Sequence, residues 1–229
     1  MKYSSDRKVC FEEKDHSYYE VETGQKLLSV TSMISHFKQP FNAEEVALRL
    51  SLKGGNTVEE ILQEWEHKRN KACELGTYLH NGLEDAFNGK PRELNFEKYA
   101  KAQIVNKFIR EIVLTKKIKP VLVEPIAYDL ERGLAGQVDL VGDTSKGRFI
   151  FDYKTNEEIK RKNFFQRMKK PFEYLDDCNF NHYALQLNIY RELLKNQGVK
   201  VDGMYLIHFD FFEFKFLKIK EIDVKGKLK

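Results

Sequence analysis

Cysteine is scarce in this chain, and its few copies are scattered. The 229 residues contain three cysteines, Cys10, Cys73 and Cys178, and no Cys-x-x-Cys spacing. An odd and unclustered set of cysteines argues against a disulfide framework and against a cysteine-based zinc site. We therefore expect the fold to rest on a hydrophobic core, for which an apolar share of 41% is sufficient.

Long hydrophobic runs are absent as well. No apolar segment of the sequence approaches the roughly 20 residues that a membrane-spanning helix needs. The first eight residues, MKYSSDRK, also lack the apolar stretch of a signal peptide. We expect a soluble, intracellular protein with no membrane partner. The length of the chain suits one compact domain with at most a small appendage.

The sequence has no strong excess of charge, but its basic residues cluster locally. The net charge is +4, which is compatible with ordinary solubility. Lys160, Arg161 and Lys162 precede the stretch Asn163–Gln166, which contains two phenylalanines, and three more basic residues follow within 167–170. Basic groups neutralise phosphates, and interleaved aromatic rings can stack on unpaired bases. This segment is predicted to contact nucleic acid; the alternative is a solvated loop.

Two aspartates and a lysine form the most informative pattern in the chain. Asp139 lies near the end of one apolar segment, and Asp152 and Lys154 end the next, with turn residues 142–147 between them. Both segments are predicted to be adjacent strands of a hairpin. Neighbouring strands lie within about 5 Å of each other, so the two carboxylates can converge at one end of a sheet. Because side chains alternate along a strand, Asp152 and Lys154 are predicted to point to the same face.

This arrangement predicts a particular chemistry. Two converging carboxylates repel each other unless a cation lies between them, and an unpaired carboxylate in an apolar run is costly to bury. An ammonium group beside that cation can orient a nucleophilic water or stabilise developing negative charge. The pattern therefore predicts metal-assisted phosphodiester hydrolysis. The alternatives are that Asp139 only marks a strand end and that Lys154 is only a structural ion-pair partner.

The expected order of elements indicates an α/β fold with a mixed central β-sheet flanked by helices. Residues 10–28 alternate around a turn at 22–25 and are predicted to form a β-hairpin. Residues 1–55, with this hairpin and short helices, are expected to pack as an extension on a core of residues 56–229. Further helices are predicted at residues 31–39, 43–52, 57–87, 96–116 and 181–195, and further strands at 121–128, 134–141, 148–154, 204–209 and 212–220.

Five short motifs together resemble those of a known family. Gly-x-Val-Asp at 136–139, followed by Asp-x-Lys at 152–154, resembles the PD-(D/E)XK nuclease superfamily in the variant form of its RecB-type exonuclease domains. The stretch Gly76–His80 resembles the helix whose histidine joins the metal site in those domains. Residues 186–190 match their Gln-x-x-x-Tyr helix, and Glu124 lies on the strand before the first aspartate, where these domains often have a glutamate.

The resemblance implies a restriction-endonuclease-like core and a set of residue roles. One or two Mg²⁺ or Mn²⁺ ions are implied as cofactors. Taken without the resemblance, His80 is a polar residue beside a core, and Glu124, next to Pro125, is a carboxylate at a sheet edge. The implied roles are catalysis by Asp139, Asp152 and Lys154, metal binding by His80, Asp139, Asp152 and the Tyr153 carbonyl, and substrate binding by Gln186 and Tyr190. Lys160, Arg161 and Lys162 join the predicted substrate-binding residues because of their charge.

The same resemblance implies a substrate and excludes one cofactor. Several RecB-type nucleases hold an iron–sulfur cluster with four cysteines, and three cysteines cannot supply that ligation, so no cluster is expected. The implied substrate is DNA, single-stranded or with free ends, degraded by an exonuclease similar to small phage or recombination exonucleases and to the mitochondrial genome maintenance exonuclease. The expected location is the cytoplasm of a bacterium or of a phage-infected host.

Two other functions remain open from the sequence. One is a structure-selective endonuclease for flaps or junctions, and the other is a nucleic-acid-binding module that keeps the fold without cleaving. The complete set of Asp139, Asp152 and Lys154 argues against the second. The sequence gives no indication of protein partners.

Overall fold

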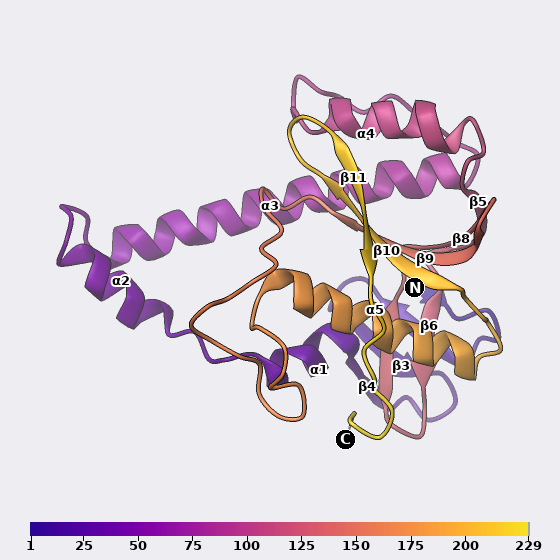
Figure 1. Ribbon diagram of the computed structural model, residues 1–229, viewed down its shortest axis with the longest axis horizontal. Helices are drawn as coiled ribbons and strands as arrows, with labels where there is room; N and C mark the ends of the chain where they lie inside the picture. The colour runs from indigo at the N-terminus through magenta and orange to yellow at the C-terminus, as the bar shows by residue number, and fades with distance from the viewer. Residues whose placement is uncertain (229) are drawn as a thin grey trace.

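The computed structural model describes residues 1–228, which form two β-sheets flanked by helices (Figure 1). The strands are β1 (Lys2–Tyr3), β2 (Val9–Glu12), β3 (Ser17–Glu20), β4 (Lys26–Ser29), β5 (Lys119–Val123), β6 (Ile126–Asp129), β7 (Leu134–Gln137), β8 (Leu140–Thr144), β9 (Gly147–Lys154), β10 (Gly203–Phe209) and β11 (Phe214–Ile219). The helices are α1 (Val30–Phe37), α2 (Ala43–Ser51), α3 (Val58–Phe87), α4 (Ala102–Phe108), the π-helical η1 (Ile109–Val113) and α5 (Asn179–Asn196). No helix within residues 1–228 is long and apolar enough to cross a membrane.

Each of the two sheets combines parallel and antiparallel pairing. The six-stranded sheet has the order β1-β2-β3-β4-β7-β6, with β4 and β7 parallel. The five-stranded sheet has the order β11-β10-β9-β8-β5, with β9 and β10 parallel. The predicted α/β class with mixed pairing and flanking helices is confirmed, although the strands divide between two sheets. Because β4 pairs with β7, the N-terminal strands share a sheet with β6 and β7; the division at residue 55 stays a prediction.

One long hairpin belongs to both sheets because it bends in the middle. The sequence predicted uninterrupted strands at 121–128 and 134–141, but the structure interrupts the first at Glu124 and the second at Val138 and Asp139. Glu124 has a φ of +52°, which an extended strand does not allow. Across the bend, Glu124 N donates to Asp139 O (3.1 Å) and Val138 N donates to Pro125 O (3.0 Å). The hairpin therefore passes from β6–β7 in one sheet to β5–β8 in the other.

Helices cover both faces of the five-stranded sheet (Figure 1). Phe149 and Phe151 of β9 pack in a hydrophobic cluster with α3, α4 and η1, whereas Ile150 packs in a second cluster with α5 and α1. Asp152 and Lys154 follow Ile150 at two-residue intervals, so they point towards the α5 face. This agrees with the alternation that the sequence predicted for the strand.

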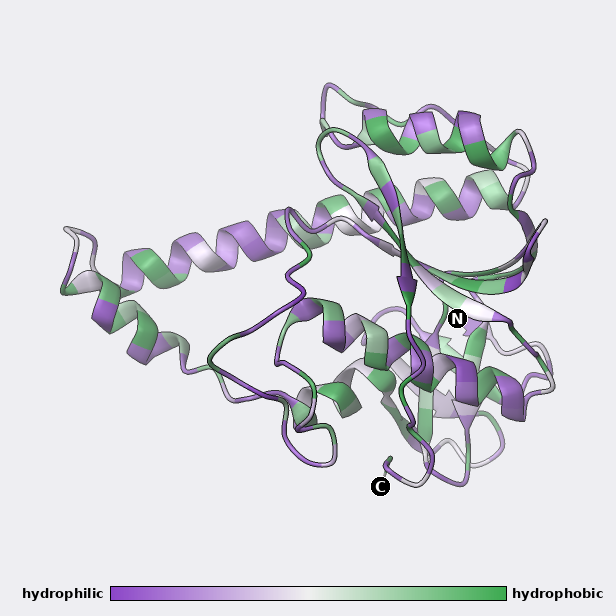
Figure 2. Ribbon diagram, viewed as in Figure 1, coloured by the Kyte–Doolittle hydropathy of each residue, from purple (hydrophilic) through white to green (hydrophobic). Residues whose placement is uncertain are grey.

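Helix α3 begins where the sequence predicted. The Thr57 hydroxyl accepts a hydrogen bond from Glu60 N, and the Glu60 carboxylate accepts one from Thr57 N, which completes a capping box. The first half of the helix projects from the body together with α2 (Figure 1), and it is mostly hydrophilic, in contrast to the strands behind its second half (Figure 2). The second half packs against the sheet through Leu79 and Leu83, both fully buried.

Two helix boundaries differ from the sequence prediction. Helix α1 spans Val30–Phe37 rather than residues 31–39, because the Ser29 side chain accepts a hydrogen bond from Ser32 N and caps it. The helix expected at 96–116 is restricted to 102–113 and changes from α to π geometry within that range. At α1 two hydroxyl-bearing neighbours compete for the same capping role. The second helix starts without a side-chain cap, so no local signal fixes its first residue.

Gly136 of β7 is predicted to be intolerant of a larger side chain. A Cβ atom there would lie 2.6 Å from Cε1 of Tyr190 and 3.1 Å from Cγ2 of Val30. Both neighbours are buried, so we expect Gly136→Ala to lower the free energy of unfolding by about 1–3 kcal/mol through overpacking. Urea unfolding measures this change. Gly55→Ala is the matched control, because nothing lies within 4 Å of its Cβ position; equal stability of both variants would contradict the prediction.

Candidate active site

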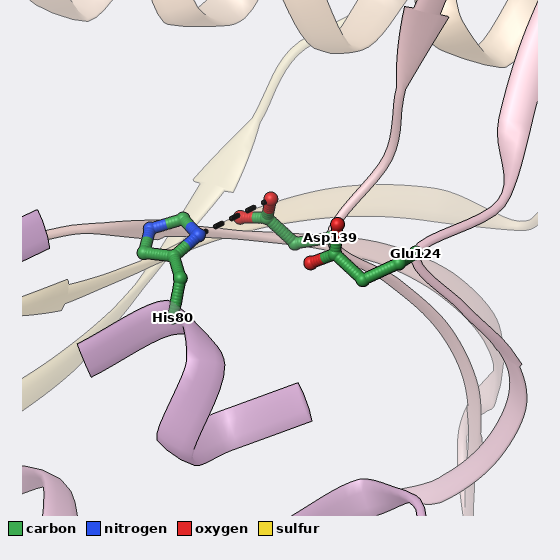
Figure 3. Close-up of side chains that lie close together, drawn as sticks. All are labelled: His80, Glu124 and Asp139. Carbon is green, nitrogen blue, oxygen red and sulfur yellow. Dashed lines mark ion pairs between the residues drawn. The ribbon is translucent and has the colours of Figure 1, made fainter. Parts of the chain in front are cut away.

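Three side chains from distant parts of the sequence meet at the bend of the hairpin. His80 comes from α3, Glu124 from the residues between β5 and β6, and Asp139 from the residues between β7 and β8 (Figure 3). One nitrogen or oxygen of each residue lies within 4.8 Å of those of the other two. A cation of suitable size can therefore contact all three residues.

Asp139 is held in place by the neighbouring strand. Its Oδ2 accepts a hydrogen bond of 2.6 Å from Tyr153 N, and its Oδ1 lies 3.5 Å from His80 Nδ1. The other ring nitrogen of His80, Nε2, lies 3.2 Å from the carbonyl oxygen of Tyr153. The pairing of Leu140 with Phe151 sets Asp139 opposite Asp152 at the end of the sheet. The structure therefore brings four of the predicted site residues together, namely His80, Asp139, Asp152 and Tyr153.

Lys154 is the fifth predicted site residue in this cluster, and its ammonium pairs with Asp152. Nζ of Lys154 lies 2.5 Å from Oδ2 of Asp152, and both side chains are largely buried. Among the described residues, this Oδ2 atom accepts no hydrogen bond, so the ion pair is its only polar contact. On its other side Lys154 lies 4.6 Å from the ring centroid of Tyr183 in α5. Asp152 thus faces Lys154 and is not part of the group formed by His80, Glu124 and Asp139.

The Asp139 carboxylate stabilises the charged forms of His80 and Lys154, and these two cations in turn stabilise the carboxylate. Burial opposes the charged form of His80, but the Asp139 carboxylate overcomes this and raises the histidine pKa to about 8. Burial likewise opposes ionisation of Asp139, yet His80 and Lys154 together lower its pKa below the ordinary value. Burial also acts against the Lys154 ammonium, and attraction to Asp152 and Asp139 raises its pKa nonetheless. Lys154 therefore remains a cation at neutral pH.

The positive charge near Glu124 and Asp152 is too small to offset their burial, so the pKa values of both carboxyl groups are raised. Burial and repulsion from Asp139 raise the pKa of Glu124 to about 8. Burial raises the pKa of Asp152 to about 6, since attraction to Lys154 offsets only part of it and Asp139 adds to it. The site holds more carboxylate than its own cations neutralise, since in the described chain Glu124, Asp139 and Asp152 face only the two cations His80 and Lys154. Oxygen ligands with one imidazole fit Mg²⁺ or Mn²⁺.

An open cleft of about 910 Å³ gives access to the cluster. Its lining includes His80, Glu124 and Asp139 on one side and the N-terminal residues Lys2 and Phe11 on the other. The N-terminal strands therefore form a wall of the cleft. Its full lining is Lys2, Phe11, Glu13, His16, Gly76, Thr77, His80, Asn81, Glu84, Asp85, Arg92, Glu124, Gln137 and Asp139.

The predicted substrate-binding residues lie at two different places. Tyr190 lines a smaller pocket of about 260 Å³, which shares Gln137 with the large cleft, and its hydroxyl accepts a hydrogen bond of 3.0 Å from Gln186 Nε2. Lys160, Arg161 and Lys162 are exposed on the segment after β9 and do not line the cleft. These three basic residues are therefore predicted to contact an approaching substrate at a place away from the candidate active site.

Sequence reasoning gave too little weight to Glu124. It treated the residue as a carboxylate at a sheet edge because Pro125 follows it. In the structure the same proline lies at the bend, which turns Glu124 towards His80 and Asp139. The signal was present, since a proline inside a predicted strand indicates an interruption as well as an edge.

Lys101 was missed altogether. This residue precedes α4, is 2% exposed, and donates from Nζ to the carbonyl oxygens of Thr155 (2.6 Å) and Asn156 (3.2 Å). His208 Nε2 lies 2.8 Å from the same carbonyl oxygen of Asn156. These contacts fix the chain directly after the strand that carries Asp152, Tyr153 and Lys154. No motif or spacing in the sequence identifies such a lysine.

Comparisons with known proteins add a family assignment. Residues 39–221 match the family model of the PD-(D/E)XK nuclease superfamily. A search of curated proteins gave no match. A similar solved structure, described as "Crystal structure of SSO0001", has 16% sequence identity and a TM-score of 0.37, and the alignment covers 88% of this chain and 70% of that chain. The family match includes every residue of the cluster around Asp139.

The metal-free protein is predicted to lose stability as pH rises towards 8. The pKa of His80 is raised from 6.5 and that of Glu124 from 4.5, both to about 8, so the folded state binds protons more tightly than the unfolded chain. The stabilisation is complete below the ordinary pKa values and is lost as pH rises through about 8. Urea unfolding in EDTA between pH 5 and 8.5 measures it. Glu124→Gln should make the decline shallower; a free energy of unfolding that rises over this interval contradicts the prediction.

Lys101→Met is predicted to destabilise the end of β9. The substitution leaves the carbonyl oxygen of Thr155 without its lysine donor, and we expect the free energy of unfolding to fall by about 1–3 kcal/mol. Thermal or urea unfolding measures the loss. Lys107→Met on α4 is the control, because Lys107 is exposed and its substitution should change stability by less than about 0.5 kcal/mol. Similar values for the two variants would refute a structural role of Lys101.

Proposed function

Because this chain belongs to the PD-(D/E)XK nuclease superfamily, we propose that it is a RecB-type deoxyribonuclease that degrades DNA from single-stranded or frayed ends. The family identifies a nuclease that hydrolyses phosphodiester bonds of nucleic acid with divalent metal ions. The restriction to DNA and to ends is the proposed part, as is the RecB type within the superfamily. Its support is the arrangement of the individual residues around the cleft.

One observation carries the proposal. The hydrogen bond from Tyr153 N to Asp139 Oδ2 ties the first aspartate to the strand that bears Asp152 and Lys154. Two carboxylates and an ammonium therefore meet at the end of one sheet, next to an open cleft. This is the set of groups that metal-assisted phosphodiester hydrolysis requires.

The proposed metal ligands are the residues that already surround Asp139. His80, Asp139, Asp152 and the carbonyl of Tyr153 would hold one or two Mg²⁺ or Mn²⁺ ions, and Glu124 is close enough to add a further carboxylate. A bound ion would supply Lewis acidity, which lowers the pKa of a coordinated water far below the bulk value of about 15.7. The imidazole of His80 favours Mn²⁺ over Mg²⁺ within this set.

The proposed role of Lys154 follows from its charge. Its raised pKa keeps the ammonium protonated, so it acts as a fixed cation and not as a general base. A buried cation at this place orients the attacking water and stabilises the negative charge that develops on the phosphate. Asp152 fixes the position of the ammonium through their ion pair.

The proposed substrate contacts surround this centre. Tyr190 lines the smaller pocket next to the cleft and accepts a hydrogen bond from Gln186. Lys160, Arg161 and Lys162 would neutralise phosphates of the incoming strand. The wall that Lys2 and the other N-terminal residues form limits the cleft on one side. The preference for an exonuclease over an endonuclease rests on the resemblance of the motifs to those of RecB-type exonuclease domains.

Loss of either catalytic group is predicted to abolish cleavage. We expect Asp139→Ala and Lys154→Ala each to lower kcat at least about 100-fold, because each removes charge stabilisation at the reacting phosphate. Release of nucleotides from linear single-stranded DNA with Mn²⁺ measures this, and EDTA should stop the reaction of the wild type. Urea unfolding of each variant in EDTA is the control for folding. Unchanged turnover in either variant would refute the assigned roles.

Circular and linear single strands then separate the three functions. Digestion of linear DNA alone supports the exonuclease. Digestion of the circle at an equal rate would contradict it in favour of an endonuclease, and binding without cleavage of any DNA would indicate the non-cleaving module. A parallel assay with RNA tests the restriction to DNA.

A further inference from the structure

Cation–aromatic pairs connect the active site to the basic segment after β9. Lys154 lies 4.6 Å from the ring centroid of Tyr183, and the Arg161 guanidinium lies 4.8 Å from that of Phe180. Phe180 and Tyr183 are three residues apart on α5, so they share one face of the helix. Both rings are partly exposed. Alternating positive charge and aromatic surface therefore extends from Lys154 along the first turn of α5.

The same alternation continues onto an exposed turn. Lys162 lies 6.0 Å from the ring centroid of Phe164. Phe164 is 84% exposed and its neighbour Phe165 is 94% exposed. We call Tyr183, Phe180, Phe164 and Phe165, with the cations Lys154, Arg161 and Lys162, the aromatic track.

The turn that presents the two phenylalanines is fixed by side-chain hydrogen bonds. Oδ1 of Asn163 accepts from Phe165 N (3.1 Å) and Gln166 N (3.2 Å), while its Nδ2 donates to Asp177 O (2.7 Å). Below the turn, Met168 is buried in the core cluster of α1 and α5. The two rings are thus held in solvent by an ordered backbone, which reduces the conformational entropy that a ligand must remove.

The charge around this turn indicates the kind of ligand. Residues 160–170 contain six basic residues and no acidic one. Phe212 is similarly exposed, at 86%, on a turn that a side chain also fixes, but there Asp210 accepts from Phe212 N and from Glu213 N. Exposed aromatic rings thus occur in both an acidic and a basic setting. Of these two turns, only the one that carries Phe164 and Phe165 combines exposed aromatic rings with charges that attract a polyanion.

Single-stranded nucleic acid is the polyanion that fits such a surface. Its bases have free planar faces, whereas those of a duplex are covered by their neighbours in the stack. Stacking on aromatic side chains combined with phosphate neutralisation is the usual mode of single-strand binding. Resting on the proposed function, we propose that the aromatic track guides one unpaired strand to Lys154, with bases stacked on Phe164 and Phe165 at its outer end.

The test is a binding measurement that requires no cleavage. Fluorescence anisotropy in EDTA gives the affinity of the full chain for a labelled oligothymidylate and for a duplex of the same length. We expect the double variant Phe164→Ala, Phe165→Ala to bind the single strand at least about tenfold more weakly. Its affinity for the duplex should stay within about twofold, and the slope of affinity against salt should not change, because no cation is removed.

Phe212→Ala is the matched control, since it removes an equally exposed ring from an acidic turn. It should bind as the wild type does. Lys162→Ala should weaken binding and reduce the salt slope. Because all four substituted positions are exposed, the variants should unfold at the wild-type urea concentration, and sedimentation should show the wild-type mass.

The outcomes separate this proposal from the proposed function. Wild-type affinity of the double variant, an equal loss of duplex binding, or a change in self-association without a change in single-strand binding would each overturn the aromatic track. Selective loss of single-strand binding supports it, even if the wild-type chain cleaves no DNA with Mn²⁺, a result that would refute the nuclease assignment instead.

Discussion

The bend in the hairpin of β5–β6 and β7–β8 is the constraint on which the site depends. Strand β8 begins at Leu140, and Val138 forms its backbone hydrogen bond with Pro125 across the bend. Tyr153 N therefore donates to the side chain of Asp139 in place of a strand partner. A buried N–H group that lacks a partner is costly, so the interruption of the ladder and the position of the carboxylate stabilise each other. The geometry of the candidate site thus follows from satisfying the hydrogen bonds of the backbone.

The site also depends on its balance of charge, in which the carboxylates outnumber the positively charged side chains. His80 and Lys154 lie within the cluster of carboxylates and keep Asp139 ionised, yet Glu124 and Asp152 retain raised pKa values. Because these acidic groups lie close together without full neutralisation, their repulsion lowers the free energy of unfolding when no metal is bound. The same arrangement would favour the binding of a divalent cation, because the cation would relieve the repulsion between these carboxylates.

Local patterns in the sequence predicted the parts of this site that depend on local rules. Alternation along β9 places Asp152 and Lys154 on one face, and the capping box starts α3 at Thr57. Residues that depend on tertiary context were not predictable in this way. Pro125 signals an interruption beside Glu124, but neither the positive φ of Glu124 nor the side chains that it meets can be read from the sequence. The partners of Lys101 are carbonyl groups 54 and 55 residues further along the chain. The division of the strands between two sheets likewise depends on how the bent hairpin packs.

Helix α3 connects the site to the most distant part of the molecule. Its thirty residues correspond to a rod of about 45 Å, with His80 in the half that packs on the sheet and α2 attached near the opposite end (Figure 1). The projecting arm and the candidate site therefore share one continuous helix. Whatever contacts the arm touches the same element that positions the His80 imidazole beside Asp139.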